Sequence, residues 1–212
     1  SEIDYNGAPG GYAADPTEVV NYVSKHDNQT LWDMISYKAS QEADLATRVR
    51  MQAVSLATVM LGQGIAFDQQ GSELLRSKSF TRDSYDSGDW FNRVDYSLQD
   101  NNYNVGMPRI SDDGSNYDVI TRVKEMVATP GEAELKQMTA FYQELTELRK
   151  SSPLFTLGDG SAVMKRVDFR NTGPDQQAGL LIMTIDDGVQ AGASLDGRVD
   201  GLVVAINAAP ES

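Results

Sequence analysis

Two short apolar runs joined by a helical pattern constrain the fold most strongly. The first run is VVNYV at residues 19–23, and the second begins the segment GIAFDQQG at residue 64. Between them, apolar residues recur at helical spacing in residues 45–60. A strand, a helix and a strand in that order predict a parallel pair with a right-handed crossover. Parallel sheets are covered on both faces, so we expect the first run to be buried and further strands to lie outside this chain.

The rest of the first predicted domain consists of loops and helices. Residues 1–17 are predicted to form a loop, and Thr30 to cap a short helix that begins at Leu31. Residues 77–116 are polar and irregular but contain several aromatic residues, which is typical of a functional loop. Two helices are expected next, at residues 117–128 and 132–149, followed by Pro153. These features predict a first domain over residues 1–151.

The pattern changes to short apolar runs beyond residue 151. SAVMKRVDF, GLLIMTIDD and GLVVAINAAP are separated by clusters of Gly, Asp and Pro, which predicts antiparallel strands. Three strands are too few for an independent sandwich. We therefore expect residues 152–212 to be the first part of an all-β domain.

Charge and composition exclude several classes of function. The 31 acidic and 18 basic residues give a formal net charge of −13, which argues against a surface that binds nucleic acid or anionic membranes. The chain has no cysteine, so it has neither disulfides nor thiolate metal sites. We find no apolar run long enough to span a membrane and no signal-peptide pattern at the first residues. A zinc site is disfavoured because the chain has one histidine.

The single histidine lies in a polar cluster directly after the first predicted strand. His26, Asp27 and Asn28 follow that run, and α/β folds bind ligands at the carboxyl ends of parallel strands. Adjacent His and Asp side chains supply a donor and an acceptor to vicinal hydroxyls of a sugar. A carboxylate also stabilises the oxocarbenium-like transition state of glycoside hydrolysis. A lone histidine is more often a surface or core residue, but three polar groups at a strand end favour a sugar site.

Other polar and aromatic residues have simpler structural interpretations. Glu73 is expected to be an ion-pair partner of Arg76 or Lys78 rather than a catalytic acid. Trp32 has helical spacing with other apolar residues and is expected in the core, whereas Trp90 in the polar loop could contact a sugar.

A calcium site is a further possibility in the second half of the loop. The oxygen-bearing side chains there lack the D-x-D-x-D-G spacing of an EF-hand, so a solvated loop is the simpler expectation. The candidate ligands are Asp112, Asp113, Ser115 and Asp118.

Several motifs, in order, resemble pullulanases of the α-amylase superfamily, especially the larger bacterial pullulanases and limit dextrinases. The motifs are YVSKHDN, GQGIAFDQQGSELLRSK, DSYDSGDWFNRVDYS and SSPLFTLGDG. The resemblance covers nearly the whole chain. It implies an α/β fold, the C-terminal portion of a (β/α)8 TIM barrel followed by the start of an antiparallel β-sandwich domain. The two apolar runs would then be the seventh and eighth barrel strands.

The resemblance also implies roles for five residues. His26 would bind hydroxyls of the glucose at the cleavage subsite, and Asp27 would be the catalytic acid that stabilises the transition state. Asn28 would be a neighbouring sugar contact, and Asp83 and Tyr85 would line the donor-side subsites. The family's nucleophile and acid/base belong to upstream strands that this sequence does not contain. We therefore expect the chain alone to be inactive.

The function implied is that of a debranching enzyme which cleaves α-1,6-glucosidic bonds in pullulan and limit dextrins by a retaining mechanism. Its expected partners are an α-glucan substrate and the N-terminal part of the same enzyme, with no nucleic acid. No cofactor is required, although calcium is possible, and an extracellular or cell-surface bacterial location is implied. The alternatives are part of an α-1,4-acting amylase and a non-catalytic glucan-binding module.

Overall fold

The computed structural model describes residues 4–11 and 13–209, which form two compact units. Unit 1 comprises Ser1–Asn21, Met60–Phe67 and Leu148–Ser212. Unit 2 comprises Tyr22–Val59 and Asp68–Glu147. The division at residue 151 stays a prediction, and the outermost residues of the two predicted domains lie outside the described residues.

A parallel pair of short strands in unit 1 confirms the pairing predicted from the two apolar runs. β3 (Val20–Asn21) pairs with β4 (Ile65–Ala66), and the N–H of Ile65 donates to the carbonyl of Val19 at 2.8 Å. The expected burial of the first run is wrong, because Val20 is 50% exposed; Ile65 of the second run is 47% exposed. The physical reason is that, within the described residues, the sheet contains β3 and β4 alone.

A small hairpin replaces the loop expected near the N-terminus. β1 (Asp4–Tyr5) pairs antiparallel with β2 (Ala8–Pro9), and the turn residues Asn6 and Gly7 have φ values of 54° and 84°. Two consecutive positive φ angles are the geometry of a type I′ turn, for which Asn-Gly is the preferred sequence. The dipeptide was therefore a usable hairpin signal. A 3-10 turn, η1 (Pro16–Glu18), precedes β3.

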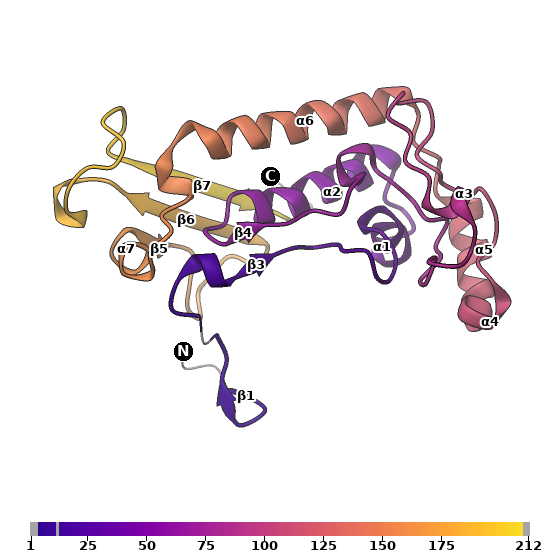
Figure 1. Ribbon diagram of the computed structural model, residues 1–212, viewed down its shortest axis with the longest axis horizontal. Helices are drawn as coiled ribbons and strands as arrows, with labels where there is room; N and C mark the ends of the chain where they lie inside the picture. Colours follow the sequence, from indigo (N-terminus) through magenta and orange to yellow (C-terminus); the bar gives the residue numbers. More distant parts are fainter. Residues whose placement is uncertain (1–3, 12, 210–212) are drawn as a thin grey trace. The chain divides into compact units, whose positions relative to one another are not determined.

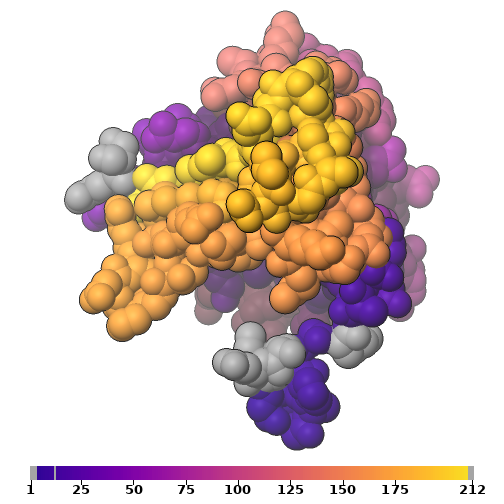
Figure 2. All heavy atoms as spheres, turned by 90° about the vertical axis from the view of Figure 1, so that its left-hand side faces the viewer, coloured from indigo at the N-terminus to yellow at the C-terminus, as the bar shows by residue number. Residues whose placement is uncertain are grey.

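The C-terminal part of unit 1 contains an antiparallel sheet of order β5-β6-β7. Its members are β5 (Val167–Phe169), β6 (Leu180–Asp186) and β7 (Gly201–Asn207). The antiparallel pairing agrees with the pattern of the three apolar runs. Figure 1 shows the three strands side by side, and Figure 2 shows their residues in orange and yellow. Whether a sandwich is built on this sheet stays a prediction.

A helix occupies the first six of the nine residues that were expected to form the first of these strands. Residues Gly160–Arg166 form α7, and only the last three residues of SAVMKRVDF are in β5. Asp159 is the N-cap, and its Oδ1 accepts from the N–H of Ala162 at 2.8 Å. This cap satisfies a free N–H of the first turn and so favours the helix over the strand. α7 packs against β5 and β6 (Figure 1).

The remaining elements are helices, most of them in unit 2. The longer helices are α1 (Leu31–Lys38), α2 (Leu45–Met60), α5 (Tyr117–Met126) and α6 (Glu132–Ser151). The short ones are η2 (Ser72–Leu74), α3 (Asp89–Asn92), α4 (Ile110–Asp113), η3 (Gly114–Asn116), η4 (Pro153–Phe155) and η5 (Val189–Ala191). Thr30 caps α1 as predicted, because its Oγ1 accepts from the N–H of Asp33. Among the helices described, none has the length and apolar character needed to cross a membrane.

The core of unit 2 lies between these helices and the start of the polar loop. Trp32 of α1 is fully buried, as expected, and α1 packs against α5. Phe80 in the loop is also fully buried, and its ring lies 4.9 Å from that of Tyr37 and 5.5 Å from that of Tyr103. Both pairs are edge-to-face, the arrangement that aromatic rings prefer. The first residues of the predicted loop and Tyr103 are therefore part of the core, whereas Tyr85 and Trp90 of the same loop are exposed.

Candidate functional site

The predicted site residues His26, Asp27 and Asn28 lie in unit 2, on the segment before α1. The Nε2 of His26 is 3.3 Å from Oδ1 of Asp27, and their side chains are 85% and 52% exposed. Asn28 is also exposed. An imidazole, a carboxylate and an amide are therefore presented together to solvent, as a site for sugar hydroxyls requires.

The carboxylate of Asp27 is held in its charged form by its neighbours. Lys25 donates a hydrogen bond from Nζ to Oδ2 of Asp27, and this bond is the main reason that the pKa of Asp27 is lowered. Partial desolvation opposes the effect, while the neighbouring His26 and the positive charges of Lys25 and Lys78 add to it. Asp27 is therefore ionised at neutral pH, which is the state that stabilises a developing cation.

Asn28 links this segment to the polar loop. Its φ of 62° is in the left-handed region, which Asn tolerates better than most residues. Its Oδ1 accepts a hydrogen bond from Nε of Arg82 at 3.0 Å. Arg82 directly precedes Asp83, so the contact brings the backbone of the second predicted site segment towards the first.

Asp83 and Tyr85 are both exposed, and the residue between them is buried. Tyr85 is 87% exposed, whereas Ser84 is 6% exposed. Ser84 is held by Asn92: its Oγ donates to Oδ1 of Asn92, and Nδ2 of Asn92 donates to the carbonyl of Ser84, both at 2.7 Å. Anchoring Ser84 inward leaves the flanking side chains, Asp83 and Tyr85, directed to solvent. Both are therefore available to a ligand.

A buried carboxylate that the sequence analysis did not single out organises the beginning of this loop. Asp33 in the first turn of α1 is fully buried and accepts from Oγ of Ser77 at 2.5 Å and from the N–H groups of Lys78 and Phe80 at 2.9 and 3.2 Å. Burial raises the pKa of Asp33, and these hydrogen bonds partly offset the increase. Its position looked like that of an ordinary acid near a helix N-terminus, so the sequence held no signal for this role.

Glu73 has a structural role, but not the expected one. Its Oε2 accepts from the N–H of Gly71 at 3.0 Å. Arg76 instead donates to the carbonyls of Gln70 and Asn92, at 3.0 and 2.8 Å. The ion pair expected between Glu73 and a basic neighbour is thus replaced by hydrogen bonds to the main chain.

Two of the acidic residues considered as calcium ligands have other partners. Asp112 pairs with Arg109 at 2.7 Å, and Asp113 is fully buried, where its Oδ2 accepts from the N–H of Arg82 at 3.1 Å. The expectation of a solvated loop is therefore wrong for Asp113, which ends α4. The part of the chain that the structure describes holds no group of three or more His, Cys, Asp or Glu arranged to bind a metal.

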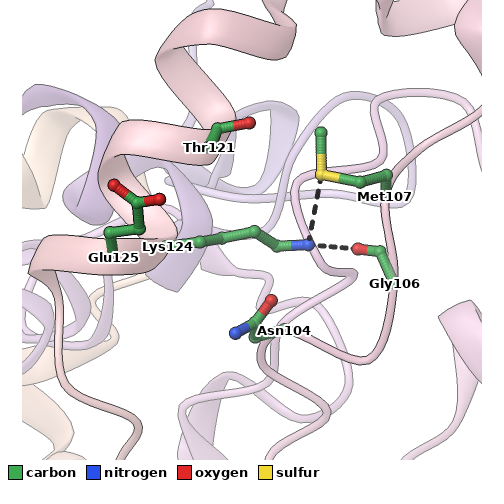
Figure 3. Close-up of a pocket in the computed structure, with 6 residues that line it drawn as sticks. All are labelled: Asn104, Gly106, Met107, Thr121, Lys124 and Glu125. Carbon is green, nitrogen blue, oxygen red and sulfur yellow. Dashed lines mark hydrogen bonds between the residues drawn. The ribbon is translucent and has the colours of Figure 1, made fainter.

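Trp90 remains available, and a pocket lies elsewhere in unit 2. Trp90 is 64% exposed and contacts Phe91 edge-on. The pocket has a volume of about 310 Å³ and contains none of the predicted site residues in its lining (Figure 3). Lys124 extends across it, and its Nζ donates to the carbonyl of Gly106 and lies 3.7 Å from Sδ of Met107 (Figure 3). This lysine already has a partner in the protein.

The family of the chain follows from comparison with known proteins. Residues 98–212 match the model of α-1,6-glucosidases, pullulanase-type, C-terminal. The chain belongs to this family. The resemblance based on the motifs is thereby confirmed.

Pullulanases are also the relatives found by sequence and by structure. The chain is 96% identical over 212 residues to a pullulanase of Klebsiella pneumoniae, of which it covers 19%. It is 40% identical to chloroplastic pullulanase 1 of Arabidopsis thaliana, over 97% of this chain and 22% of the relative. A crystal structure of Klebsiella pneumoniae pullulanase complexed with maltotriose matches with a TM-score of 0.96 and 92% identity, over 100% of this chain and 20% of that one. The chain thus spans about a fifth of the length of the curated pullulanases it matches.

Proposed function

We propose that this chain is part of a pullulanase that hydrolyses α-1,6-glucosidic bonds in pullulan and limit dextrins with retention of configuration. The observation that carries the proposal is the exposed, ionised carboxylate of Asp27 beside the imidazole of His26, in a chain of the pullulanase family. The maltotriose bound to a related structure supports an α-glucan as the ligand.

In this proposal, Asp27 acts on the transition state. As the glycosidic bond breaks, positive charge develops on the ring, and a nearby carboxylate that is already ionised stabilises it without reorganisation. His26 and Asn28 bind ring hydroxyls. Asp83 accepts from a neighbouring sugar, and the exposed ring of Tyr85 can contact the apolar face of a glucose unit.

The residues that break the bond belong to the longer enzyme. Retaining glycosidases use a nucleophile and an acid/base about 5 Å apart, and we place both outside this chain. We also propose that β3 and β4 are the last two strands of a (β/α)8 barrel. The exposed apolar side chains of Val20 and Ile65 support this, because neighbouring strands and helices would cover them. An extracellular or cell-surface location and optional calcium rest on the resemblance alone.

Product analysis of the longer enzyme tests the proposal. Pullulan consists of maltotriose units joined by α-1,6 bonds, so cleavage of those bonds should release maltotriose, whereas α-1,4 cleavage should leave trisaccharides that retain an α-1,6 bond. The 212-residue chain alone should give no turnover. Products that retain the α-1,6 bond would indicate an amylase, and glucan binding without turnover by the longer protein would indicate a binding module.

A further inference from the structure

A buried lysine lies between the two segments of the candidate site. Lys78 is 1% exposed, and its Nζ donates to the carbonyl of His26 at 3.3 Å and to that of Arg82 at 3.4 Å. Lysine is almost never fully buried unless it is paired, because removing an ammonium group from water is costly. The two carbonyls that receive this ammonium belong to the residues next to Asp27 and Asp83.

The backbone around Lys78 is itself held in place. Its N–H donates to Oδ2 of the buried Asp33 at 2.9 Å. The next two residues, Ser79 and Phe80, have φ values of 50° and 68°, which are unfavourable for residues with a side chain. Such conformations persist only where the surroundings impose them, and they are concentrated at functional sites. The ammonium of Lys78 therefore extends from a firmly held backbone.

A second bridge joins the same two segments. Arg82 donates from Nε to Oδ1 of Asn28 at 3.0 Å, and its own N–H donates to Oδ2 of the buried Asp113 at 3.1 Å. Lys78 thus ties the two main chains together from the inside, and Arg82 ties the side chain of Asn28 to the loop at the surface.

We propose that Lys78 and Arg82 are positioning residues that hold the His26–Asn28 segment and the Asp83 loop in one geometry for the glucan. This inference rests on the proposed function. A carboxylate that stabilises a transition state must be placed accurately, since a displacement of about 1 Å can cost on the order of 10²-fold in rate. The two bridges act on the backbone that carries Asp27 and on its neighbour Asn28.

Lys124 offers a matched control for Lys78. Lys124 is partly buried, whereas Lys78 is fully buried. Burial lowers the pKa of both lysines, and the Nζ of Lys124 also donates to a main-chain carbonyl, that of Gly106 (Figure 3). Replacing either lysine by methionine removes the same ammonium and keeps a side chain of similar length. The Lys124 bond, however, joins α5 to a part of the loop that carries no predicted site residue.

The test compares Lys78→Met with Lys124→Met in the longer enzyme, by kcat and KM on pullulan and by melting temperature. Lys78→Met should lower kcat/KM by about 10- to 100-fold, mainly through kcat, at temperatures where the variant is folded. Lys124→Met should stay within about twofold, because its bond does not reach the site. Equal losses in the two variants, in step with their melting temperatures, would show that Lys78 only stabilises the fold and would overturn the proposal.

Arg82→Gln tests the surface bridge even if Lys78→Met does not fold, because Arg82 is exposed. Loss of the hydrogen bond to Asn28 should lower kcat/KM by about three- to tenfold. Arg93→Gln, which removes an exposed arginine paired with Asp95 and Asp100, should leave kcat/KM unchanged. An unchanged Arg82→Gln enzyme would contradict the proposal. Failure of the wild-type enzyme to release maltotriose from pullulan would instead refute the proposed function, and this inference with it.

Discussion

At the scale of single residues, two buried charges organise the loop that carries part of the site. Burial raises the pKa of Asp33 and lowers that of Lys78, because each charged form loses its hydration. Asp33 compensates with hydrogen bonds from the Ser77 hydroxyl and from main-chain N–H groups, and Lys78 with hydrogen bonds to main-chain carbonyls, rather than by a direct ion pair. A carboxylate that accepts several N–H groups fixes backbone conformation, which explains how a stretch with unfavourable φ angles remains ordered.

The first prediction follows from this role of Asp33. Asp33→Ala should leave the N–H groups of Lys78 and Phe80 buried without an acceptor, at a cost of about 1–3 kcal/mol each. Hydrogen exchange of the peptide over residues 77–81, measured by mass spectrometry in the longer enzyme, should accelerate by roughly 10²-fold. Asp44→Ala is the control: it removes an exposed acceptor of the Thr47 N–H, and exchange of residues 77–81 should not change. Unchanged exchange in Asp33→Ala would contradict the role.

The sequence predicted His26, Asp27 and Asn28 as one site because the three are adjacent and follow an apolar run. Asp33 and Lys78 were not predicted, because they are 45 positions apart and meet only in the folded chain. Lys78 was considered only as a partner for Glu73, since a lysine is ordinarily expected at the surface. Local motifs could therefore locate the candidate site, but not the residues that support it.

At the scale of secondary structure, local sequence patterns predicted the strands that pair. They did not predict the helix α7 or the hairpin of β1 and β2. The short apolar run SAVMKRVDF was predicted to be a strand, but Asp159 caps a helix, α7, that contains its first six residues. The Asn6-Gly7 dipeptide forms the hairpin turn between β1 and β2, in a segment that was predicted to be a loop. At α7 a capping hydrogen bond outweighed the pattern of apolar residues, and at Asn6-Gly7 a turn preference outweighed the loop-like composition of the segment.

One carboxylate, that of Asp187, holds the segment between β6 and β7 through hydrogen bonds. Asp187 is buried and accepts from the N–H groups of Leu195 and Asp196 at 2.9 and 2.7 Å, and from Nη1 of Arg166 at 2.5 Å. The pKa of Asp187 is lowered, chiefly by the hydrogen bond from the Asp196 N–H, against an opposing effect of burial. A lowered pKa means that the folded form favours the ionised carboxylate.

The second prediction concerns the pH dependence of the stabilisation that Asp187 gives to this segment. Because the folded pKa is below the ordinary value of 3.8, the stabilisation is fully present above that value and is lost as the pH falls further through the folded pKa. Asp187→Asn should therefore accelerate hydrogen exchange of residues 188–200 at pH 7, after correction for intrinsic rates, whereas the wild type should show such exchange only below about pH 3.8. Asp168→Asn, which removes an exposed partner of Arg170, is the control and should behave as the wild type. Equal exchange in Asp187→Asn and wild type at pH 7 would disprove the role of this carboxylate.

At the scale of the whole molecule, the sequence predicted a parallel pair and a group of antiparallel strands, and both are present. The apolar side chains of β3 and β4 are exposed, because burial of a parallel strand needs neighbours on both faces and on both edges. A pattern of hydrophobic residues predicts that a strand is buried, but it does not identify the strands or helices that bury it. The family match, and the 19% of a related pullulanase that this chain covers, support the proposal that a longer enzyme supplies that cover.

The kinetics of Asp27→Asn in the longer enzyme test the central claim most directly. The substitution keeps size and hydrogen-bonding capacity and removes the charge, which matters most when the sugar ring becomes cationic. We expect kcat on pullulan to fall by roughly 10²-fold or more while KM stays within about threefold, and Asp44→Asn to retain normal kinetics. If Asp27→Asn keeps a near-normal kcat, Asp27 does not stabilise the transition state, and the site proposed around it is wrong.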